Sequence, residues 1–410
     1  MKIHILRLID CYTGPFCCRL LIYLSKGWEF IRFSQRTKHE THPKKILIMK
    51  FWGMGTILLA SSSIRNIKKK YPSSEITLLT LLMNQELCSI LTVFDKKLYL
   101  DIQNPLKFLY SYFRVLRIMR KQGYDTVIDL EFITFFSALT TLLVVIFSKP
   151  KTIIGFNSPI KWRNSIYTYN VSFDHSRHIS MIFSKMFGIL NLESNSISLE
   201  EDREDLLDAG DTSFFRNHTD LNNLKAGSCH LICVNINAGA LSHLRRWPRE
   251  NFVYILKKLV KNFPNLKIAL IGSKVDESYV RGLWIQLSET DQIINLCGQL
   301  SISQLIGLFS KSNFLITNDS GPLHIAVTLG LPTISFFGPE TPYLYGPQDT
   351  CHHIFYSDIF CSPCINIFNS KSSACQENIC LKKITPASVL KVIEEKYIKL
   401  IDFDQEDCKN

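Results

Sequence analysis

Short apolar runs alternate with helical patterns through the first half of the chain. Residues 46–49 form an apolar run, a glycine-containing turn follows at 52–55, and residues 57–70 have the spacing of a helix. Further apolar runs predict strands at residues 76–82, 127–130 and 152–154. Alternation of this kind predicts a parallel sheet with helices on both faces.

The second half repeats this pattern more regularly. Strands are predicted at residues 231–236, 266–271, 293–296, 314–317 and 333–336. Helices are predicted at residues 249–263, 301–311 and 323–329. Ser301 and Gln304 have the spacing of a capping box, and Gly330 provides a helix stop. We therefore predict a second parallel sheet covered by helices.

A polar, acidic segment at residues 195–228 separates the two patterns. A chain of 410 residues is also too long for one ordinary core. We predict an α/β protein with two Rossmann-like, doubly wound domains. The predicted divisions are an amphipathic, apolar N-terminal extension at 1–44, a first domain at 45–215, a second domain at 225–395 and a polar tail at 396–410.

The chain is basic overall. It has 47 Lys and Arg against 36 Asp and Glu, and its formal charge of +11 favours phosphorylated small molecules or anionic lipid as partners. No basic run with interleaved aromatic residues has the pattern of a nucleic-acid platform, so no nucleic-acid partner is predicted. Hydrophobic residues make up 46% and charged residues 20%, which excludes the disordered and fibrous classes.

Cysteine usage bears on the compartment. Most cysteines stand alone in apolar surroundings, as Cys88, Cys233 and Cys297 do, which is typical of reduced cytoplasmic proteins. The apolar stretch at 15–24 is interrupted by Arg19 and has no signal-peptide cleavage site. We therefore expect a cytoplasmic protein, either free or at the inner face of the cytoplasmic membrane.

Two segments bear on membrane contact. Residues 132–148 form an uncharged, largely apolar run of 17 residues, which is short for a membrane span and favours a buried helix. Residues 1–35 mix Arg and Lys with Leu, Ile, Phe and Trp, a composition suited to an anionic lipid surface. A helix packed on the first domain is an equally good interpretation of this N-terminal segment, and both stay open.

The turn at residues 318–322 has the strongest chemical signal. It joins a predicted strand to a predicted helix, at the sheet edge where doubly wound folds bind ligands. Gly321 allows close backbone approach to an anion, Ser320 supplies a hydroxyl, and the helix start offers free amides. His324 on the first helical turn can donate to a phosphate or a sugar, whereas Asp319 suits nearby amides or a ligand hydroxyl. The turn therefore predicts a phosphate site.

A glycine-containing basic loop follows the first strand of the second half. Gly239 precedes Arg245 and Arg246, and the same edge rule predicts that this loop faces the phosphate site. Arg245 can neutralise a diphosphate leaving group without a metal. Arg246 is better interpreted as part of a solvated loop. Gly272 ends the next strand, and the acidic pair at 276–277 is a candidate ribose contact.

Several motifs together resemble one enzyme family. The segments are Thr317-Asn-Asp-Ser-Gly-Pro-Leu-His324, Phe337-Gly-Pro-Glu-Thr-Pro342, Arg245-Arg-Trp-Pro248 and Gly53-Met-Gly-Thr-Ile57. They are similar to the signature of glycosyltransferase family nine, the ADP-heptose:lipopolysaccharide heptosyltransferases, and the similarity covers residues 45–395. The resemblance implies a GT-B fold whose two domains face a cleft, inversion at the anomeric carbon, and no cofactor for catalysis. It also implies an acceptor site in the first domain, a nucleotide-diphosphate sugar site in the second, and a lipid-linked glycan acceptor such as the lipopolysaccharide core.

One position departs from the family pattern. Well-studied members have an aspartate after the Met-Gly of the first turn, proposed as the base that deprotonates the acceptor, and this chain has Thr56. A threonine hydroxyl cannot act as a general base near neutral pH. Asp129 and Glu131 lie at the end of a predicted strand of the first domain, and Glu131 is the substitute candidate, with a helix N-terminal acid as its alternative interpretation. The catalytic candidates are therefore Glu131, Thr56 and Arg245.

Four cysteines cluster within residues 361–380. Cys361 and Cys364 are followed by Cys375 and Cys380, at spacings close to those of structural zinc sites. Relatives with a Cys-Ser-Pro-Cys segment have similar cysteines, so the resemblance implies a local structural clip rather than catalysis. A structural zinc and a disulfide both stay open.

Two other functions compete with glycosyl transfer. No Gly-x-Gly-x-x-Gly follows a predicted strand with an acidic residue about 20 positions later, which disfavours a Rossmann-type oxidoreductase. A binding protein that keeps the donor site without turnover is consistent with Thr56.

Overall fold

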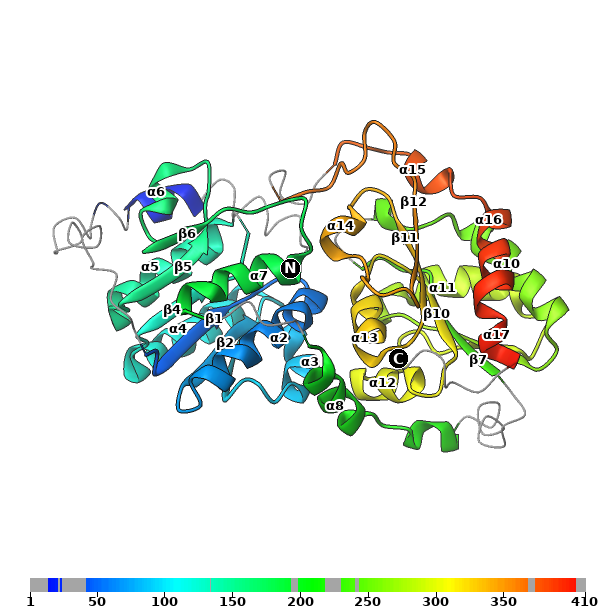
Figure 1. Ribbon diagram of the computed structural model, residues 1–410, viewed down its shortest axis with the longest axis horizontal. Coiled ribbons are helices and arrows are strands. Elements are labelled where there is room, and N and C mark those ends of the chain that lie inside the picture. Colours follow the sequence, from blue (N-terminus) through cyan, green and yellow to red (C-terminus); the bar gives the residue numbers. More distant parts are fainter. Residues whose placement is uncertain are drawn as a thin grey trace. The chain divides into compact units, whose positions relative to one another are not determined.

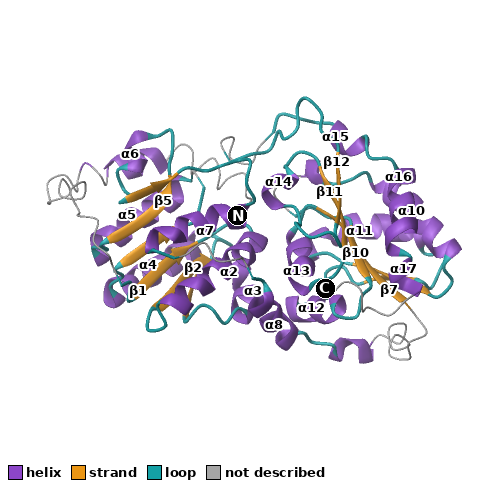
Figure 2. Cartoon of the chain, viewed as in Figure 1, coloured by secondary structure: helices purple, strands orange, loops and turns teal. Residues whose placement is uncertain are grey.

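The structure is a computed structural model that describes residues 14–20, 23, 42–132, 134–192, 198–217, 230–239, 243–367 and 373–402. The chain divides into two compact units, Met1–Ser198 (unit 1) and Leu199–Asn410 (unit 2), which contain the elements labelled in Figure 1. Each unit is built on a parallel sheet covered by helices, as the alternating pattern predicts (Figure 2).

The sheet of unit 1 has the strand order β3-β2-β1-β4-β5-β6, and each neighbouring pair is parallel. Its strands are β1 (Lys45–Met49), β2 (Glu75–Leu81), β3 (Lys96–Leu100), β4 (Thr126–Asp129), β5 (Thr152–Phe156) and β6 (Tyr169–Val171). The strand order reverses between β1 and β4, and this reversal is where doubly wound folds bind ligands at the carboxyl edge.

The helices of unit 1 are α2 (Met54–Lys70), α3 (Gln85–Ile90), α4 (Pro105–Gln122), α5 (Phe135–Ser148), α6 (Lys161–Asn164) and α7 (Ile179–Phe187). Packing joins α4 to α5 and α2 to α7. Right-handed crossovers place α4 and α5 on one face of the sheet and α2 on the other. The sheet is therefore buried on both faces, which suits the continuous apolar runs of its central strands.

Residues 135–148 of the apolar run form the helix α5, as the buried-helix interpretation predicts. Thr134 caps its N-terminus by accepting a hydrogen bond from the backbone N–H of Ser137, and Ala138 and Leu142 are buried. In the described part of the chain, no helix has both the length and the apolar character needed to cross a membrane.

A short helix at residues 14–20 packs on α5. Cys18 is buried in a cluster with Ala138, Leu142 and Ile166, while Phe16 and Leu20 are exposed. Packing on the first domain is therefore observed for this part of the N-terminal extension. Residues 1–13 and 24–41 lie outside the described residues, so the lipid-surface interpretation of residues 1–35 stays a prediction.

The sheet of unit 2 has the strand order β12-β11-β10-β7-β8-β9, again with parallel neighbours. Its strands are β7 (His230–Asn235), β8 (Leu266–Leu270), β9 (Ile293–Asn295), β10 (Phe314–Asn318), β11 (Thr333–Phe337) and β12 (His353–Tyr356). The order reverses between β7 and β10, so the loops that follow these two strands meet at the carboxyl edge.

The helices of unit 2 are α8 (Glu200–Ala209), α10 (Arg249–Asn262), α11 (Glu277–Trp284), α12 (Ile302–Phe309), α13 (Gly321–Leu329), α14 (Pro342–Tyr345), α15 (Ile379–Lys382), α16 (Pro386–Val392) and α17 (Lys399–Asp402). Ser301 caps α12 in the predicted capping box, and Gly330 ends α13 with a φ of 75°. The acidic segment between the two patterns contains α8, which packs against α12 and α13.

Three strands were not predicted from the sequence, and all three lie at sheet edges. β3, β6 and β12 are largely half-buried, and β6 has one exposed residue. An edge strand has a sheet neighbour on one side only, so it tolerates polar residues such as Lys96 and Lys97 in β3 and Asn170 in β6, which interrupt the apolar pattern.

An ion pair is fully buried in unit 1. Arg163 Nη2 lies 3.5 Å from Asp129 Oδ2, and the side chains are 1% and 0% exposed. Tyr167 donates its hydroxyl to the same carboxylate oxygen at 2.7 Å. Burial raises the pKa of Asp129, whereas Arg163 and the Tyr167 hydrogen bond lower it. The folded state therefore depends on Arg163 to keep a charged carboxylate in the core.

Replacing Arg163 with Met should lower the free energy of unfolding by about 3 kcal/mol near neutral pH, because Asp129 is left buried and unpaired. The loss should shrink at lower pH, because a raised pKa means that the folded state takes up the proton more readily than the unfolded chain. Urea unfolding at about pH 7.5 and about pH 5 measures both effects.

The matched control is Arg177→Met, which removes an exposed pair with Asp174. It should change the free energy of unfolding by less than about 0.5 kcal/mol. Similar losses in the two variants would contradict the role assigned to the buried pair.

Candidate functional site

The candidate donor site lies at the carboxyl end of β10 in unit 2. Asp319 and Ser320 follow this strand directly and are buried, and α13 begins at Gly321. Pro322 occupies the first helical turn, where its missing N–H leaves no intrahelical bond unmade. The segment therefore folds as the predicted strand, turn and helix, with a helix N-terminus at the carboxyl edge of the sheet.

An amide network beneath the turn holds it in place. Asn235, at the end of β7, donates from Nδ2 to Thr317 Oγ1 at 3.0 Å and to Ser320 Oγ at 2.8 Å. Its Oδ1 accepts from the backbone N and the Nδ2 of Asn237 at 3.2 and 3.1 Å. The Ser320 hydroxyl is bonded inward and does not cap α13. The first amides of this helix are therefore free of a side-chain cap.

Asn318 joins the turn to the arginine loop, which we define as residues 243–247. Its Oδ1 accepts from the backbone N of Trp247 at 2.8 Å, and its Nδ2 donates to the backbone carbonyls of Ile236 and Asn237 at 2.9 and 3.3 Å. Trp247 is fully buried. One side chain thus fixes the arginine loop and the segment after β7 against the turn.

The C-terminal part of unit 2 also holds the arginine loop. Asn378 donates from Nδ2 to the carbonyls of Leu244 and Arg246 at 3.1 and 2.9 Å. Trp247 donates from Nε1 to the carbonyl of Ile384 at 3.0 Å. The position of this loop is therefore set by residues far away in the sequence.

The structure brings Arg245 and Asp319 together. Arg245 Nη1 lies 2.9 Å from Asp319 Oδ2, and Nη2 donates to the carbonyl of Ala238 at 2.7 Å. Among the described residues, the buried Nε of Arg245 and the buried Oδ1 of Asn237 have no hydrogen-bond partner. An open donor and an open acceptor in this region are groups that a bound ligand can satisfy.

The interpretation of Arg246 as part of a solvated loop is wrong. Its Nη2 lies 3.3 Å from Asp276 Oδ1, its side chain is 13% exposed, and its guanidinium carbon lies 4.2 Å from the ring centroid of Tyr279. Ser273 also donates its hydroxyl to Asp276 at 2.6 Å in a capping box. Asp276, a candidate ribose contact from the sequence, is therefore bound by two side chains of its own unit.

Two of the predicted glycines have different structural roles. Gly239 has a φ of +66°, and the space that a side chain would occupy is open. A side chain at Gly272 would collide with Asn237 and with the sulfur of Cys297. Gly239 thus permits the backbone turn after β7, and Gly272 permits the close approach of the loop after β8 to the amide network.

His324 is buried on the first turn of α13. Burial lowers the pKa of His324 to about 4, with Asp319 raising it and Arg245 lowering it further. The imidazole is therefore neutral near pH 7 and can donate one N–H without adding positive charge.

Glu131 lies at the carboxyl edge of the sheet in unit 1. Its Oε1 accepts from Lys50 Nζ at 2.9 Å and from the backbone N–H groups of Phe51 and Trp52 at 2.6 and 2.8 Å. Lys50 and Glu131 are each 2% exposed. The carboxylate thus anchors the turn between β1 and α2. It does not cap a helix, because the cap of α5 is Thr134.

Thr56 lies in the first turn of α2. Its hydroxyl donates to the carbonyl of Gly53 at 2.6 Å, and Gly53 has a φ of +83°. Asp129, the other carboxylate at the end of β4, pairs with Arg163 in the core. Of the two acidic residues singled out at this strand end, the one that contacts the turn is Glu131.

The cysteine cluster gives no support to a structural zinc. In the described part of the chain, no disulfide bond joins its four cysteines: Cys361, Cys364, Cys375 and Cys380. The pKa of Cys380 is raised to about 11, mainly by burial and in smaller part by the nearby sulfurs of the other three cysteines. Within the described ranges, however, no three His, Cys, Asp or Glu side chains are arranged to hold a metal ion.

The sequence alone does not identify the asparagines that organise the candidate donor site. Asn235 and Asn237 follow a buried apolar strand and are separated by one residue. Residues two apart in an extended chain lie on the same side, so this spacing was a usable signal. Asn318 lies in the predicted turn, but its position in the sequence does not indicate the loops that its side chain joins.

The family follows from a direct comparison. The model of glycosyltransferase family 9 (heptosyltransferase) matches residues 112–374, more than half of the chain. The chain belongs to glycosyltransferase family 9. It is therefore a glycosyltransferase of the heptosyltransferase family, and its two parallel six-stranded sheets are those of the GT-B fold.

Curated family members share modest identity with the chain. Lipopolysaccharide heptosyltransferase 1 of Campylobacter coli is 22% identical over 361 residues, which cover 86% of this chain and 99% of that protein. Lipooligosaccharide heptosyltransferase 2 of Campylobacter jejuni is 26% identical over 167 residues, which cover 40% of this chain and 50% of that protein. The second match thus spans half the length of the relative.

Solved structures share the fold. A family 9 glycosyltransferase from Veillonella parvula aligns with a TM-score of 0.68 and 21% identity, covering 87% of this chain and 98% of that one. The heptosyltransferase WaaC of Escherichia coli, solved with ADP, aligns with a TM-score of 0.63 and 14% identity, covering 86% and 99%. At these identities the likeness is evidence for the fold alone.

Replacing His324 with Gln should flatten the loss of stability on acidification. Burial lowers the pKa of His324 from 6.5 to about 4. Between these two pH values, the unfolded chain takes up a proton that the folded state does not. This group therefore costs the wild-type protein up to about 1.4 kcal/mol per pH unit as the pH falls through this range. Urea unfolding of both proteins at several pH values across it measures the difference.

His243→Gln is the matched control, because His243 is exposed and lies in the arginine loop. Its stability should follow the wild-type pH dependence. Equal pH slopes for the wild type and the His324 variant would show that His324 is not the buried neutral group described above.

Proposed function

We propose that the chain transfers a heptose from ADP-heptose to a sugar of the lipopolysaccharide core. The observation that carries the proposal is the donor site of unit 2, where the uncapped start of α13 lies beside Arg245 and its open Nε. Helix amides and a guanidinium together suit a diphosphate. Membership of a heptosyltransferase family supports the heptose, and the ADP in the WaaC structure supports the adenine nucleotide.

The reaction exchanges one C–O bond for another. An acceptor hydroxyl attacks the anomeric carbon of the heptose, and the bond to the β-phosphate oxygen breaks, so that ADP leaves with the electron pair. The start of α13 and Arg245 stabilise the charge that develops on the diphosphate, and this role needs no metal ion. Asp319 holds Arg245 in place through their 2.9 Å ion pair. Attack opposite the leaving group inverts the anomeric carbon.

Glu131 is the proposed acceptor of the proton that the attacking hydroxyl loses. It is the carboxylate at the turn where other members of the family have an aspartate, and its contacts with Lys50, Phe51 and Trp52 all use Oε1. In this proposal Oε2 faces the acceptor. The hydroxyl of Thr56 is bonded to Gly53 and positions the first turn of α2.

The acceptor is proposed to be lipid-linked and to be reached at the inner face of the cytoplasmic membrane. The formal charge of +11 favours an anionic, membrane-held substrate. Lipopolysaccharide heptosyltransferase 1 of Campylobacter coli, which aligns over 99% of its length, supports the lipopolysaccharide core as the acceptor class.

If the donor site prefers adenine, ADP should raise the melting temperature of the protein more than UDP or GDP does at equal concentration. A ligand that binds the folded state adds about 2.7 kcal/mol of stability at one hundred times its Kd, so the tighter ligand gives the larger shift.

Arg245→Met should weaken ADP binding roughly tenfold to a hundredfold, because it removes a charge-assisted contact to the diphosphate. Isothermal titration calorimetry measures the change.

Arg246→Met is the matched control for Arg245. Arg246 pairs with Asp276 rather than with Asp319, so ADP binding should change much less. Equal losses in the two variants, or no nucleotide preference, would count against the proposed donor site.

Glu131→Gln should lower the transfer rate by about a hundredfold to ten-thousandfold while leaving the ADP affinity unchanged. Gln keeps an oxygen that can accept from the backbone N–H groups of Phe51 and Trp52, but it leaves the buried Lys50 without a charged partner. The rates are therefore compared at a temperature at which thermal melting shows the variant to be folded. Steady-state transfer and calorimetry with ADP provide the two measurements. Unchanged turnover removes Glu131 from the mechanism.

A donor-binding protein without turnover is the second candidate. Thr56 favours it, because its hydroxyl cannot replace a general base and is already bonded to Gly53. ADP release from ADP-heptose, measured with and without a lipopolysaccharide-core acceptor, distinguishes the two. Acceptor-dependent release supports transfer, and ADP-heptose binding without release supports the second candidate.

A further inference from the structure

Helix α4 of unit 1 exposes an apolar stripe. Leu106 is 80% exposed, Leu109 49%, Tyr110 74% and Phe113 67%. Their spacing places all four on one side of the helix. Exposed apolar side chains that occur singly are ordinary on protein surfaces, but four on one helical stripe indicate a contact surface.

The opposite side of α4 accounts for its packing. Val115 and Met119 are buried, and Phe108 and Tyr112 contact Phe136 of α5 with ring centroids 5.9 and 6.1 Å apart. Tyr112 and Thr140 are also joined through their hydroxyls at 3.2 Å. The exposed stripe is therefore not needed to hold α4 on unit 1.

Basic side chains continue the same stripe toward the end of the helix. Arg117 and Arg120 follow Phe113 at helical spacing and are exposed. Three further exposed basic residues flank the stripe: Lys107, Arg114 and Lys121. The sequence of α4 contains no acidic residue. Within the described ranges, no ion pair joins Arg117 or Arg120 to an acidic side chain.

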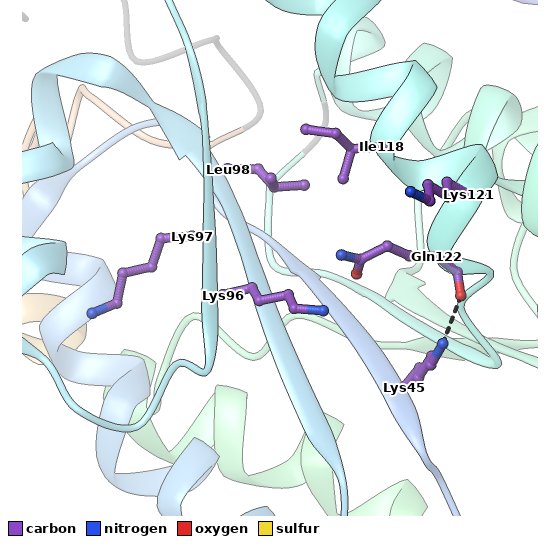
Figure 3. Close-up of a pocket in the computed structure, with 7 residues that line it drawn as sticks. All are labelled: Lys45, Lys96, Lys97, Leu98, Ile118, Lys121 and Gln122. Carbon is purple, nitrogen blue, oxygen red and sulfur yellow. Dashed lines mark hydrogen bonds between the residues drawn. The ribbon is translucent and has the colours of Figure 1, made fainter.

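A basic pocket adjoins the C-terminal end of α4 (Figure 3). It has a volume of about 550 Å³ and is lined by Lys45, Lys96, Lys97, Leu98, Ile118, Lys121 and Gln122. Lys96 pairs with Glu75 at 2.7 Å, and Lys45 donates to the carbonyl of Gln122 at 2.9 Å. Four lysines line the pocket, and it therefore extends the positive surface of α4.

We infer that the α4 face, defined as Leu106, Leu109, Tyr110, Phe113, Arg117 and Arg120, docks the protein on an anionic phospholipid bilayer. An amphipathic helix at such a surface buries its apolar side chains at the boundary of headgroups and acyl chains. Its basic residues then lie level with the lipid phosphates. The sequence of α4 contains no acidic residue that would repel a negatively charged surface.

The direction of α4 gives the docking a purpose that rests on the proposed function. Because α4 connects the parallel strands β3 and β4, it runs from the carboxyl edge of the sheet back to its amino edge. The apolar half therefore begins at the edge where Glu131 lies. Docking along the whole α4 face places unit 1 against the bilayer in which a lipid-linked acceptor is anchored, with the apolar half of the helix at the edge where Glu131 lies.

The test is co-sedimentation of the full chain with phosphatidylethanolamine vesicles that contain phosphatidylglycerol, without donor or acceptor. The variant Leu106→Ser/Phe113→Ser should bind these vesicles at least about tenfold more weakly. The variant Arg117→Gln/Arg120→Gln should also lose about tenfold or more at low salt, and its binding should depend less on salt. All four side chains are exposed, so melting temperatures should stay near that of the wild type.

The matched control is Val275→Ser/Ile285→Ser, which replaces two exposed apolar side chains of unit 2, 80% and 58% exposed. It should bind the vesicles like the wild type. The inference is overturned if this control loses binding while the α4 variants keep it, or if neither set of substitutions changes binding. It is also overturned if sedimentation without lipid reveals dimers that the α4 substitutions dissociate, because the face would then bind a second copy of the chain.

Failure of this inference can be separated from failure of the proposed function. The α4 variants should transfer sugar to a lipid-free core oligosaccharide at the wild-type rate and lose activity only toward acceptor held in vesicles. Lost vesicle binding with no transfer by any protein would reject the proposed reaction and leave the docking surface standing.

Discussion

The candidate donor site depends on the hydrogen bonds of the Asn318 side chain. Its oxygen holds the backbone of Trp247 and its nitrogen holds two carbonyls after β7, so one carboxamide fixes three segments at the carboxyl edge. A buried amide with unmet hydrogen bonds costs free energy, so these partners specify one arrangement of the loops. Arg245 and Asp319 lie on two of these segments, so this arrangement of the loops brings them together as an ion pair.

Unit 1 uses a buried charge for the same purpose. Glu131 gathers Lys50 and two backbone amides around one carboxylate oxygen and so fixes the turn between β1 and α2. A few residues away, Asp129 is matched by Arg163. Charges placed this deep are tolerated only when they are paired, so each pair restricts the conformation of the loop that it joins. Both units thus position their carboxyl-edge turns by polar contacts beneath them.

Much of the fold could be read from the sequence, whereas the support of the site could not. Central strands such as β1 and β10 are continuous apolar runs, and the turn that starts α13 has a recognisable composition. The edge strand β12 is half-buried and gives no such pattern. The burial of Arg246 depends on Asp276 and Tyr279, which approach it only in the folded unit. Short-range patterns predict elements, and contacts between distant residues decide which charges are solvated.

The arginine loop has an implication for biosynthesis. Leu244 and Arg246 are bonded to Asn378, and Trp247 to Ile384, across 134, 132 and 137 positions of the chain. On the ribosome, the strands β7 and β10 emerge before these partners do, so the sheet can form while the loop still lacks them. The arginine loop therefore reaches its described contacts only after Ile384 has been translated, together with the part of the core of unit 2 that Leu381, Ile384 and Val389 supply.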